Sequence, residues 1–379
     1  MNDPQPRLWV VARVHAPDEG GVQTYVREVT ETYVRSGWQV TLFAKSSIGP
    51  RRVTHDGRTL VDVGPGPVLR VYLRLLRAMI AAWRAGERPA AIHACTWRAA
   101  IPALIFPAPL VITVHGREIG RPRKLAFGLM RFVLRRAKRV IAVSNVTRTL
   151  LLRRIPSLGP RCRTAWNGVQ SHPQNIRRQR ENGSVKVISV CRLVPRKNIP
   201  VAVRAAAICI NRGNPLDYAV IGRGSDEPMV RAEIFRHDWQ DRITLAGYVS
   251  DEELAEHYRT ADIFLHPQIA MEDGAEIEGF GLSIADAMAH GIPCVVGQDG
   301  GPAELVRDGV TGLVVDGRSI NAITGALDLL ARDAALRERL GDNARRWAAQ
   351  NLSWQQHCAV ALAGLVRSPP PSPSWMAEG

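Results

Sequence analysis

The sequence predicts an α/β protein with two doubly wound domains, each built on a parallel sheet. Its 379 residues are enough for two domains of ordinary size, each with its own hydrophobic core. Short apolar segments typical of buried strands alternate with helical segments, and this alternation occurs in two separate series. A polar, turn-rich stretch at residues 170–183 divides the two series and is typical of a linker.

The first series opens with an apolar strand at residues 8–14, a loop that contains Gly20 and Gly21, and a helix at residues 22–35. Together with a strand at residues 40–43, these segments predict a βαβ unit. Its glycines lie at the carboxyl end of the first strand, where open α/β sheets bind ligands. Later strands of this series are predicted at residues 91–94, 110–114 and 140–143.

Two basic and partly apolar segments of the first series, residues 68–84 and 121–139, are predicted helices. Their composition fits helices that lie on a lipid surface. Amphipathic helices that cover one face of a sheet have a similar pattern. The sequence leaves both roles open.

The second series has strands predicted at residues 185–191, 218–221, 243–245, 263–265 and 294–296. Residues 336–366 have the pattern of terminal helices, and the proline-rich tail at residues 368–379 is expected to be disordered. We therefore expect an N-terminal domain over residues 1–172, a linker over 173–184 and a C-terminal domain over 185–350.

Composition narrows the class of protein. A hydrophobic content of 46% is typical of a globular chain, and the amino terminus lacks the zones of a secretory signal, so we expect a cytoplasmic protein. The longest apolar stretch, residues 99–114, is interrupted by three prolines, which argues against a membrane span. The six cysteines show no paired spacing, and we expect neither a zinc site nor a disulfide framework.

Charge is distributed unevenly along the chain. Residues 1–181 carry 31 Lys and Arg against 10 Asp and Glu, a net charge of +21, whereas residues 182–379 carry 19 against 25, a net charge of −6. This asymmetry indicates different partners for the two halves. An anionic membrane surface or an anionic acceptor near the first half would explain it, and so would arginine-rich helix faces exposed to solvent.

The most informative segment is residues 278–293, Glu-Gly-Phe-Gly-Leu-Ser-Ile-Ala-Asp-Ala-Met-Ala-His-Gly-Ile-Pro. It predicts a helix that begins at Leu282, directly after Gly279 and Gly281, whose missing side chains let backbone N–H groups approach a ligand. Such a helix start favours anions, and a diphosphate fits it. Glu278 and Asp286 are too far apart to meet within one helical turn, and they would accept hydrogen bonds from hydroxyls at different ends of an elongated ligand. A helix amino terminus with acidic residues that offset its dipole is the simpler alternative.

This pattern, Glu-x-Phe-Gly-x-x-x-x-acid-Ala-x-Ala-x-Gly-x-Pro, resembles the donor signature of the retaining glycosyltransferases called group 1 or family 4. Those enzymes have two Rossmann-like domains that face a cleft, the GT-B fold, with a C-terminal helix that crosses back to the N-terminal domain. The resemblance implies that residues 1–172 bind the acceptor, that 185–350 bind the nucleotide-sugar donor, and that 351–367 form the returning helix.

The resemblance also assigns roles within the signature. Glu278 would hold hydroxyls of the donor sugar, and the backbone that follows it would meet the sugar and the diphosphate, through Gly279, Phe280, Gly281 and Leu282. Asp286 would bind the ribose. The family usually has Glu at that second acidic position, and Asp is shorter by one carbon–carbon bond, about 1.5 Å.

Arg192 and Lys197 lie five residues apart after the first strand of the second series, within Cys-Arg-Leu-Val-Pro-Arg-Lys-Asn. Two cations there can neutralise a departing nucleoside diphosphate. The segment resembles the family motif Gly-Arg-x-x-x-x-Lys-Gly, whose Arg and Lys bind the diphosphate. Val249 follows a Gly-Tyr pair that resembles the family segment whose backbone meets the nucleobase.

In the first series, Gly20 and Gly21 resemble the family's N-terminal glycine loop, which lies over the diphosphate and the acceptor pocket. His115 follows the predicted strand 110–114, in Thr-Val-His-Gly-Arg-Glu. A histidine directly after a buried strand is expected to face the ligand site. The family carries a His-Gly pair there, and its histidine contacts the donor sugar near the reacting carbon. His115, Arg192, Lys197 and Glu278 are therefore our candidate catalytic residues.

The predicted activity is transfer of a sugar from a UDP- or GDP-type nucleotide sugar to a hydroxyl acceptor, a lipid-linked or other anionic glycan intermediate, with retention of configuration. No Asp-x-Asp occurs in the chain, so we expect no metal and no other cofactor.

A soluble natural product is the alternative acceptor. An epimerase or a phosphorylase could use the same scaffold. A nucleic-acid-binding protein would explain the basic half, but the acidic half and the 6% aromatic content argue against nucleic acid as a partner. Attachment to the inner membrane face would be peripheral.

Overall fold

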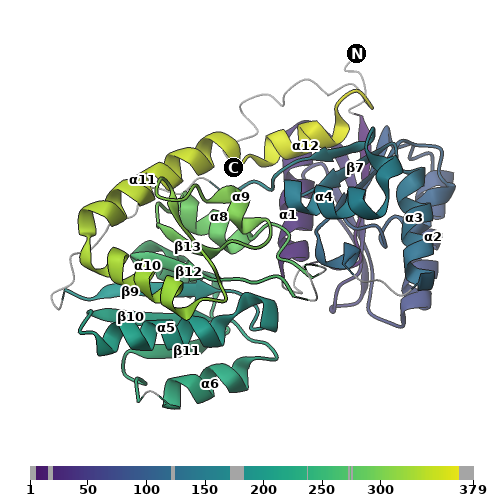
Figure 1. The fold of residues 1–379 in the computed structure, drawn as a ribbon. Coiled ribbons are helices and arrows are strands. Elements are labelled where there is room, and N and C mark those ends of the chain that lie inside the picture. Colours follow the sequence, from purple (N-terminus) through teal and green to yellow (C-terminus); the bar gives the residue numbers. More distant parts are fainter. Residues whose placement is uncertain are drawn as a thin grey trace. The chain divides into compact units, whose positions relative to one another are not determined.

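The computed structural model describes residues 6–15, 20–120, 124–170, 183–236, 238–271, 274 and 276–366. They form two compact units (Figure 1). Unit 1 combines the chain up to Gly168 with the chain from Ser353 onward, and unit 2 comprises Val169–Leu352. Most of the expected linker and all of the expected disordered tail at 368–379 lie outside the described residues.

Unit 1 is built on an eight-stranded sheet. Its strands, in chain order, are β1 (Arg7–Val11), β2 (Gln39–Ala44), β3 (Pro50–His55), β4 (Arg58–Val63), β5 (Ala91–Ala94), β6 (Leu110–Val114), β7 (Arg139–Ala142) and β8 (Cys162–Thr164). Its helices are α1 (Gly21–Arg35), α2 (Val68–Arg84), α3 (Lys124–Arg136), α4 (Asn145–Arg154) and α12 (Trp354–Leu362), with 3-10 helices η1 (Ile101–Ile105), η2 (Arg117–Ile119) and η3 (Pro156–Leu158). The spatial order is β3-β4-β2-β1-β5-β6-β7-β8, and all neighbours are parallel except β3 and β4.

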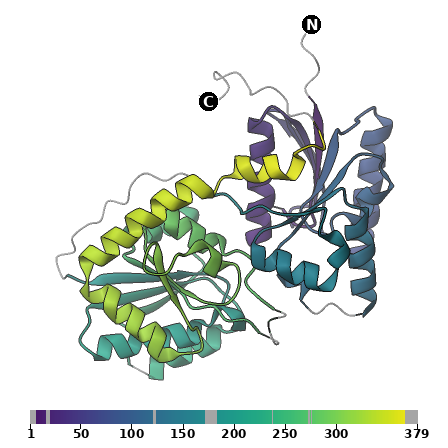
Figure 2. The ribbon, with the colours of Figure 1, turned by 45° about the horizontal axis from the view of Figure 1, so that its top comes forward.

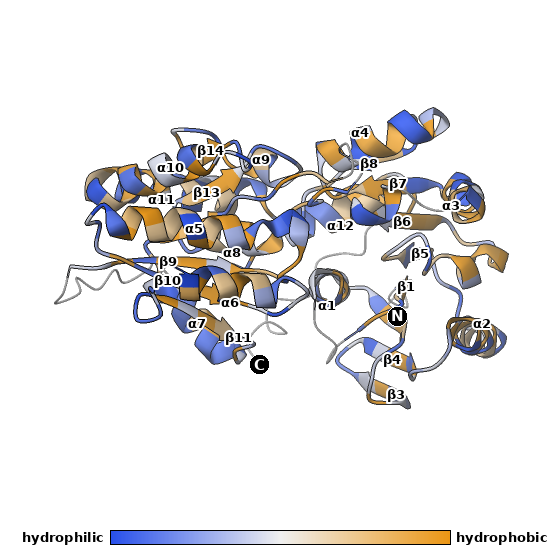
Figure 3. Ribbon diagram, turned by 60° about the horizontal axis from the view of Figure 1, so that its bottom comes forward, coloured by the Kyte–Doolittle hydropathy of each residue, from blue (hydrophilic) through white to orange (hydrophobic). Residues whose placement is uncertain are grey.

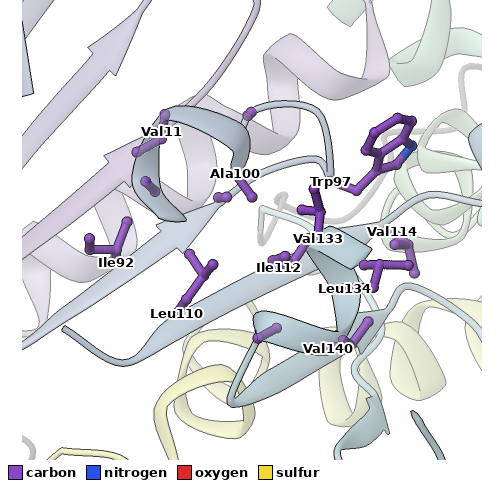
Figure 4. Close-up of a cluster of buried hydrophobic side chains, with 14 of the residues drawn as sticks. Val11, Ile92, Trp97, Ala100, Leu110, Ile112, Val114, Val133, Leu134 and Val140 are labelled. Atoms are coloured by element: carbon purple, nitrogen blue, oxygen red, sulfur yellow. The ribbon is translucent and has the colours of Figure 1, made fainter. Parts of the chain in front are cut away.

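The core of unit 1 lies between the sheet and the pair α2 and α3. Strand residues such as Ile92 and Ile112 pack there against Leu134 of α3 (Figure 4). Helix α2 buries Leu75 and Met79, one turn apart, in the same cluster. Because helices cover both faces, the central strands consist almost entirely of apolar residues, which is visible as their hydrophobic colour in Figure 3.

The last described helix, α12, completes unit 1 from the far end of the sequence. It lies beside α1 in both Figure 1 and Figure 2, and the two helices are in contact. Close packing brings Gly168 against the start of this helix, where a Cβ on the glycine would lie only 2.2 Å from the backbone nitrogen of Trp354. The returning helix of the predicted fold class is therefore present.

Unit 2 has a six-stranded, fully parallel sheet. Its strands are β9 (Val185–Val190), β10 (Leu216–Ile221), β11 (Ile243–Gly247), β12 (Ile263–His266), β13 (Cys294–Gly297) and β14 (Gly312–Val315). Its helices are η4 (Pro195–Lys197), α5 (Ile199–Asn211), α6 (Glu227–Arg236), α7 (Asp251–Thr260), α8 (Leu282–Ala289), α9 (Pro302–Leu305), α10 (Ile320–Arg332) and α11 (Ala334–Asn351).

The strand order of unit 2 is β11-β10-β9-β12-β13-β14, so the chain runs outward from β9 in one direction and then outward from β12 in the other. The carboxyl ends of β9 and β12 flank the switch point, where doubly wound sheets bind ligands. Both units have parallel Rossmann-like sheets, and the predicted fold class is confirmed. Across the described ranges, every helix is too short or too polar to cross a bilayer.

Candidate functional site

A buried cluster of opposite charges lies at the switch point of unit 2. The Oε2 atom of Glu278 is 2.8 Å from Nζ of Lys197 and 3.4 Å from Nε of Arg196. Both cations lie in η4, directly after β9, and their side chains are only 8% exposed. Lys197 and Glu278, 81 positions apart in sequence, are thus brought together, and the second cation on Glu278 is Arg196.

The turn that presents Lys197 is held by Asn198. This residue has a left-handed backbone with φ of 60°, and it ends η4 and begins α5. Its Nδ2 donates hydrogen bonds to the carbonyl oxygens of Pro267 at 3.1 Å and Gly317 at 2.6 Å. Asparagine tolerates this conformation better than most residues do. The side chain therefore fixes the loop after β9 to the loops after β12 and β14.

The ion pairs decide the protonation of Glu278. Burial alone would raise the pKa of this carboxyl group, but Lys197 and then Arg196 more than offset that effect and lower it from 4.5 to about 2. The group is therefore ionised at neutral pH, and a carboxylate in this position can accept hydrogen bonds from hydroxyl groups of a ligand.

His266 and Gln268 extend the cluster, and the sequence analysis missed both. Burial, and next the charge of Lys197, lowers the pKa of His266 to about 4, so its ring is neutral at pH 7. Its Nε2 lies 3.3 Å from Nζ of Lys197 and accepts from it, and its Nδ1 donates to Oε1 of Gln268 at 3.0 Å. The tautomer follows from these partners. For His266 the available signal was position, since it ends β12, a strand that neighbours β9.

Gly300 and Gly301, on the loop after β13, allow that loop to touch the signature segment through its backbone. The N–H of Gly301 donates to the carbonyl oxygen of Glu278 at 2.9 Å, and a Cβ on Gly300 would lie 2.6 Å from that same oxygen. Gly281 precedes α8 with φ of 91°. Helix α8 therefore begins at Leu282, as predicted, and the first N–H groups of any helix lack partners within it.

Three other predicted donor residues also belong to unit 2. Asp286 is half-buried on α8, one turn after its start, and its charge is the second cause, after burial, of the raised pKa of Tyr258. Arg192 is exposed on the loop after β9, and Val249 is half-buried on the loop after β11. All three follow the carboxyl ends of strands or the loop-to-helix junction, so they border the same edge of the sheet.

Gly222 and Gly224 have a packing role. A Cβ on Gly222 would lie 1.9 Å from the carbonyl oxygen of Cys191, and a Cβ on Gly224 would lie 2.1 Å from that of Leu193. The loop after β10 therefore lies directly against the loop that carries Arg192. These glycines set the course of the backbone beside the candidate site.

In unit 1, His115 follows β6 at the carboxyl edge of the sheet. Its backbone N–H donates to Oε1 of Glu118 at 2.8 Å, and its Nε2 donates to the carbonyl oxygen of Cys95 at 2.8 Å. Its ring also makes an edge-to-face contact with Tyr25, with centroids 4.8 Å apart. Gly20, with φ of 140°, and Gly21 begin α1. The ring of His115 is thus held in a fixed orientation.

Behind His115 lies a buried polar network that the sequence analysis missed. The hydroxyl of Tyr25 is 2.7 Å from Oγ1 of Thr113 and 2.8 Å from Nε2 of His357, and His93 is 2.8 Å from Thr113. Burial is the main cause that lowers the pKa of His93 to about 3 and that of His357 to about 4. The histidines are therefore neutral at pH 7, and the network joins α12 to the sheet without a buried charge.

The described residues contain no group of three or more His, Cys, Asp and Glu side chains that could together hold a metal ion.

Comparisons with known proteins agree with this geometry. The family profile described as "Glycosyl transferases group 1" matches residues 173–347, and that described as "Glycosyltransferase Family 4" matches residues 19–172. A GDP-mannose-dependent alpha-(1-6)-phosphatidylinositol monomannoside mannosyltransferase of Mycobacterium tuberculosis is 27% identical over 95% of this chain and 98% of its own. A D-inositol 3-phosphate glycosyltransferase of Pseudarthrobacter chlorophenolicus is 26% identical over 91% and 90%, respectively.

Solved structures show the same fold. Sucrose-phosphate synthase from Thermosynechococcus elongatus has a TM-score of 0.79 at 22% identity and covers 94% of this chain and 97% of its own. HepE of Anabaena in complex with UDP-glucose has a TM-score of 0.73 at 18% identity, with coverage of 94% and 99%. With both profiles matched, in order, over residues 19–347, the chain belongs to the group 1 and family 4 glycosyltransferases of GT-B fold, which use nucleotide sugars.

Proposed function

We propose that this enzyme transfers a sugar from a GDP- or UDP-sugar to a hydroxyl of a lipid-linked or other anionic glycan acceptor, with retention of configuration and without a metal. The observation that carries the proposal is the Lys197–Glu278 pair, which is buried at the switch point of unit 2. A cation and a carboxylate side by side offer complementary partners for a phosphate group and for the hydroxyl groups of the sugar attached to it.

Donor binding would divide this pair between two parts of the ligand. The diphosphate draws on the positive charge of Lys197 and Arg192, and the sugar hydroxyls donate hydrogen bonds to Glu278. Arg196, buried against the same carboxylate, keeps Glu278 ionised while Lys197 turns to the phosphates. Asp286 is assigned to the ribose and the backbone at Val249 to the nucleobase.

The chemical step that we propose is departure of the diphosphate with attack by the acceptor hydroxyl from the same side, through an oxocarbenium-like transition state. The acceptor proton passes to the departing phosphate oxygen as the new glycosidic bond forms. Stabilisation of the leaving group is the main catalytic contribution, and the loss of one positioned donor costs on the order of 100- to 1000-fold in rate. His115 is assigned to the donor sugar, and the loop at Gly20 and Gly21 to the diphosphate.

The relatives support an anionic acceptor. Their names specify phosphatidylinositol monomannoside in one case and D-inositol 3-phosphate in the other, and both are phosphorylated inositols. The net charge of +21 over residues 1–181 is complementary to such a molecule. We infer that the reaction takes place in the cytoplasm, with the acceptor held by unit 1.

A thermal-shift screen of UDP-, GDP-, ADP- and TDP-sugars identifies the donor, since a ligand that binds only the folded state raises the melting temperature. Release of nucleoside diphosphate only when an acceptor is present then separates transfer from epimerisation and phosphorolysis. The anomeric configuration of the product, read by NMR, tests retention. Activity that persists in EDTA tests metal independence.

Substitution tests the residues. Arg192→Ala and Lys197→Ala are each expected to lower kcat/KM by about 100- to 1000-fold, and Glu278→Ala is expected to lower it as well. Arg339→Ala, an exposed arginine on α11, is the matched control and should leave the rate unchanged. Wild-type turnover in the first three variants would overturn the assignment.

A further inference from the structure

Helices α2 and α3 present large apolar side chains to solvent. On α2, Val68 is 58% exposed, Leu69 71% and Leu73 45%. In the part of unit 1 that the structure describes, most of the exposed large hydrophobic side chains belong to this region, which also includes Ile105 of η1 and Leu125, Leu129 and Phe132 of α3. These seven residues define what we call the α2–α3 face.

These exposed residues form stripes distinct from those that cover the sheet. On α3, Leu125, Leu129 and Phe132 follow one another at four- and three-residue steps and thus share one side of the helix. The sheet is covered by a different set, which includes Met130 and Leu134. The buried stripe is therefore explained by packing against the sheet, whereas the exposed apolar stripe is not explained by it.

The α2–α3 face belongs to one side of unit 1. Both helices pack into the same hydrophobic cluster, and η1 is in contact with each of them. Figures 1 and 2 agree in showing α2 and α3 on the same side of the sheet. The exposed apolar side chains are therefore neighbours on one surface.

Charge on this face has a single sign. Helix α2 carries four arginines, helix α3 carries one lysine and three arginines, and neither they nor η1 contain an Asp or Glu. Arg70, Arg77 and Arg131 are exposed beside the apolar residues. Arginine can bury its aliphatic stem and keep its charged head at a polar boundary. Exposed apolar side chains and cations on the same helices are typical of helices that lie in the headgroup region of a bilayer.

We propose that the α2–α3 face docks unit 1 on an anionic lipid bilayer, with the apolar side chains inserted among the headgroups and the arginines paired with lipid phosphates. Nucleic acid would use the cations but gain little from seven exposed aliphatic and aromatic side chains. A protein partner would have to offer a surface that is both apolar and strongly acidic. A bilayer that contains anionic lipid supplies both properties at once. This proposal does not depend on the transfer reaction.

The test is sedimentation of the full chain with vesicles of phosphatidylcholine alone or mixed with phosphatidylglycerol, at about 0.01 M and about 0.15 M salt. We expect binding to the mixed vesicles and much weaker binding to phosphatidylcholine alone. Leu69→Ser/Leu125→Ser/Phe132→Ser should weaken binding at least about 10-fold at either salt concentration. Arg70→Gln/Arg77→Gln/Arg131→Gln should weaken it on the order of 100-fold, with a smaller salt dependence.

The matched controls lie on unit 2, because Met229 and Phe235 of α6 are 59% and 67% exposed. Met229→Ser/Phe235→Ser should bind vesicles like the wild type. Nucleotide-sugar binding, followed by thermal shift, should be unchanged in all variants, which separates this proposal from the donor assignment. The proposal is wrong if anionic vesicles fail to bind at low salt, or if the serine triple variant binds like the wild type. It is also wrong if DNA displaces the protein from vesicles and binds both triple variants as it binds the wild type.

Discussion

Glu278→Gln tests the buried ion pair through the pH dependence of stability. The pKa of Glu278 is lowered from 4.5 to about 2, chiefly by Lys197 against the opposing effect of burial. A pKa that is lower by one in the folded state corresponds to about 1.4 kcal/mol. The ionised carboxylate therefore contributes about 3 kcal/mol to the free energy of unfolding. Because the pKa is lowered on folding, this contribution is present above pH 4.5 and is lost as the pH falls toward 2.

The expected result is a stability difference between wild type and Glu278→Gln that depends on pH. It should be about 3 kcal/mol near neutral pH and fall to less than half of that by about pH 3, because below pH 4.5 the carboxyl group is protonated in the unfolded chain while it stays ionised in the folded one. Other carboxylates titrate in both proteins, and their effects cancel. Native-state hydrogen exchange of β12 and α8 measures this difference for unit 2 alone.

Glu276→Gln provides the matched control. Glu276 contacts Arg196 at 3.5 Å, and its side chain is 33% exposed, twice the exposure of Glu278. Its replacement should cost less than about 1 kcal/mol. A difference between wild type and Glu278→Gln that stays constant from neutral pH to pH 3 would refute the reasoning, since the carboxylate would then contribute nothing through its charge.

Further predictions concern packing and the buried network. Gly222→Ala should destabilise unit 2 by several kcal/mol, about 3 or more, because its Cβ would meet the Cys191 carbonyl oxygen at 1.9 Å, whereas Gly325→Ala, with open space in α10, should stabilise it by about 0.5 to 1 kcal/mol. Thermal denaturation compares the two, and equal effects would contradict the packing argument. Tyr25→Phe should destabilise unit 1 by about 1 to 3 kcal/mol, because it leaves Nε2 of the buried His357 without the hydroxyl group that it contacts. Hydrogen exchange of α12 reports that loss, and unchanged protection would mean that the hydrogen bond is dispensable.

The strands that the sequence located best are those buried on both faces. The strands at residues 91–94 and 110–114 were predicted with their observed bounds, since an uninterrupted apolar segment between polar turns leaves little freedom. The hairpin of β3 and β4 was missed. Every residue of β3 is exposed, and Pro50–His55 has the composition of a polar loop. Its strand conformation comes from pairing with β4, which no local pattern records.

In the candidate site, too, local patterns predicted some residues and not others. The positions of Lys197 and Glu278 followed from motifs at strand and helix ends, and the structure places them 2.8 Å apart. Gln268 could not be found in this way, because a glutamine after a strand has no distinctive pattern. Its part in the cluster depends on the course of the chain at the end of β13 and in the loop that follows, where the carbonyl oxygens of Gly297 and Asp299 accept its hydrogen bonds. The roles of the individual site residues in catalysis stay predictions.

The return of α12 to unit 1 has a consequence for synthesis of the protein on the ribosome. Unit 2 is continuous in sequence, so all of its residues have been translated before α12 is made. Unit 1 begins first but is completed last, since His357 must reach Tyr25 after more than 300 intervening residues. Until then the hydroxyl of Tyr25 and one side of α1 stay uncovered. A nascent chain halted before residue 353 would therefore expose an unfinished first unit to chaperones and proteases, however well its second unit had folded.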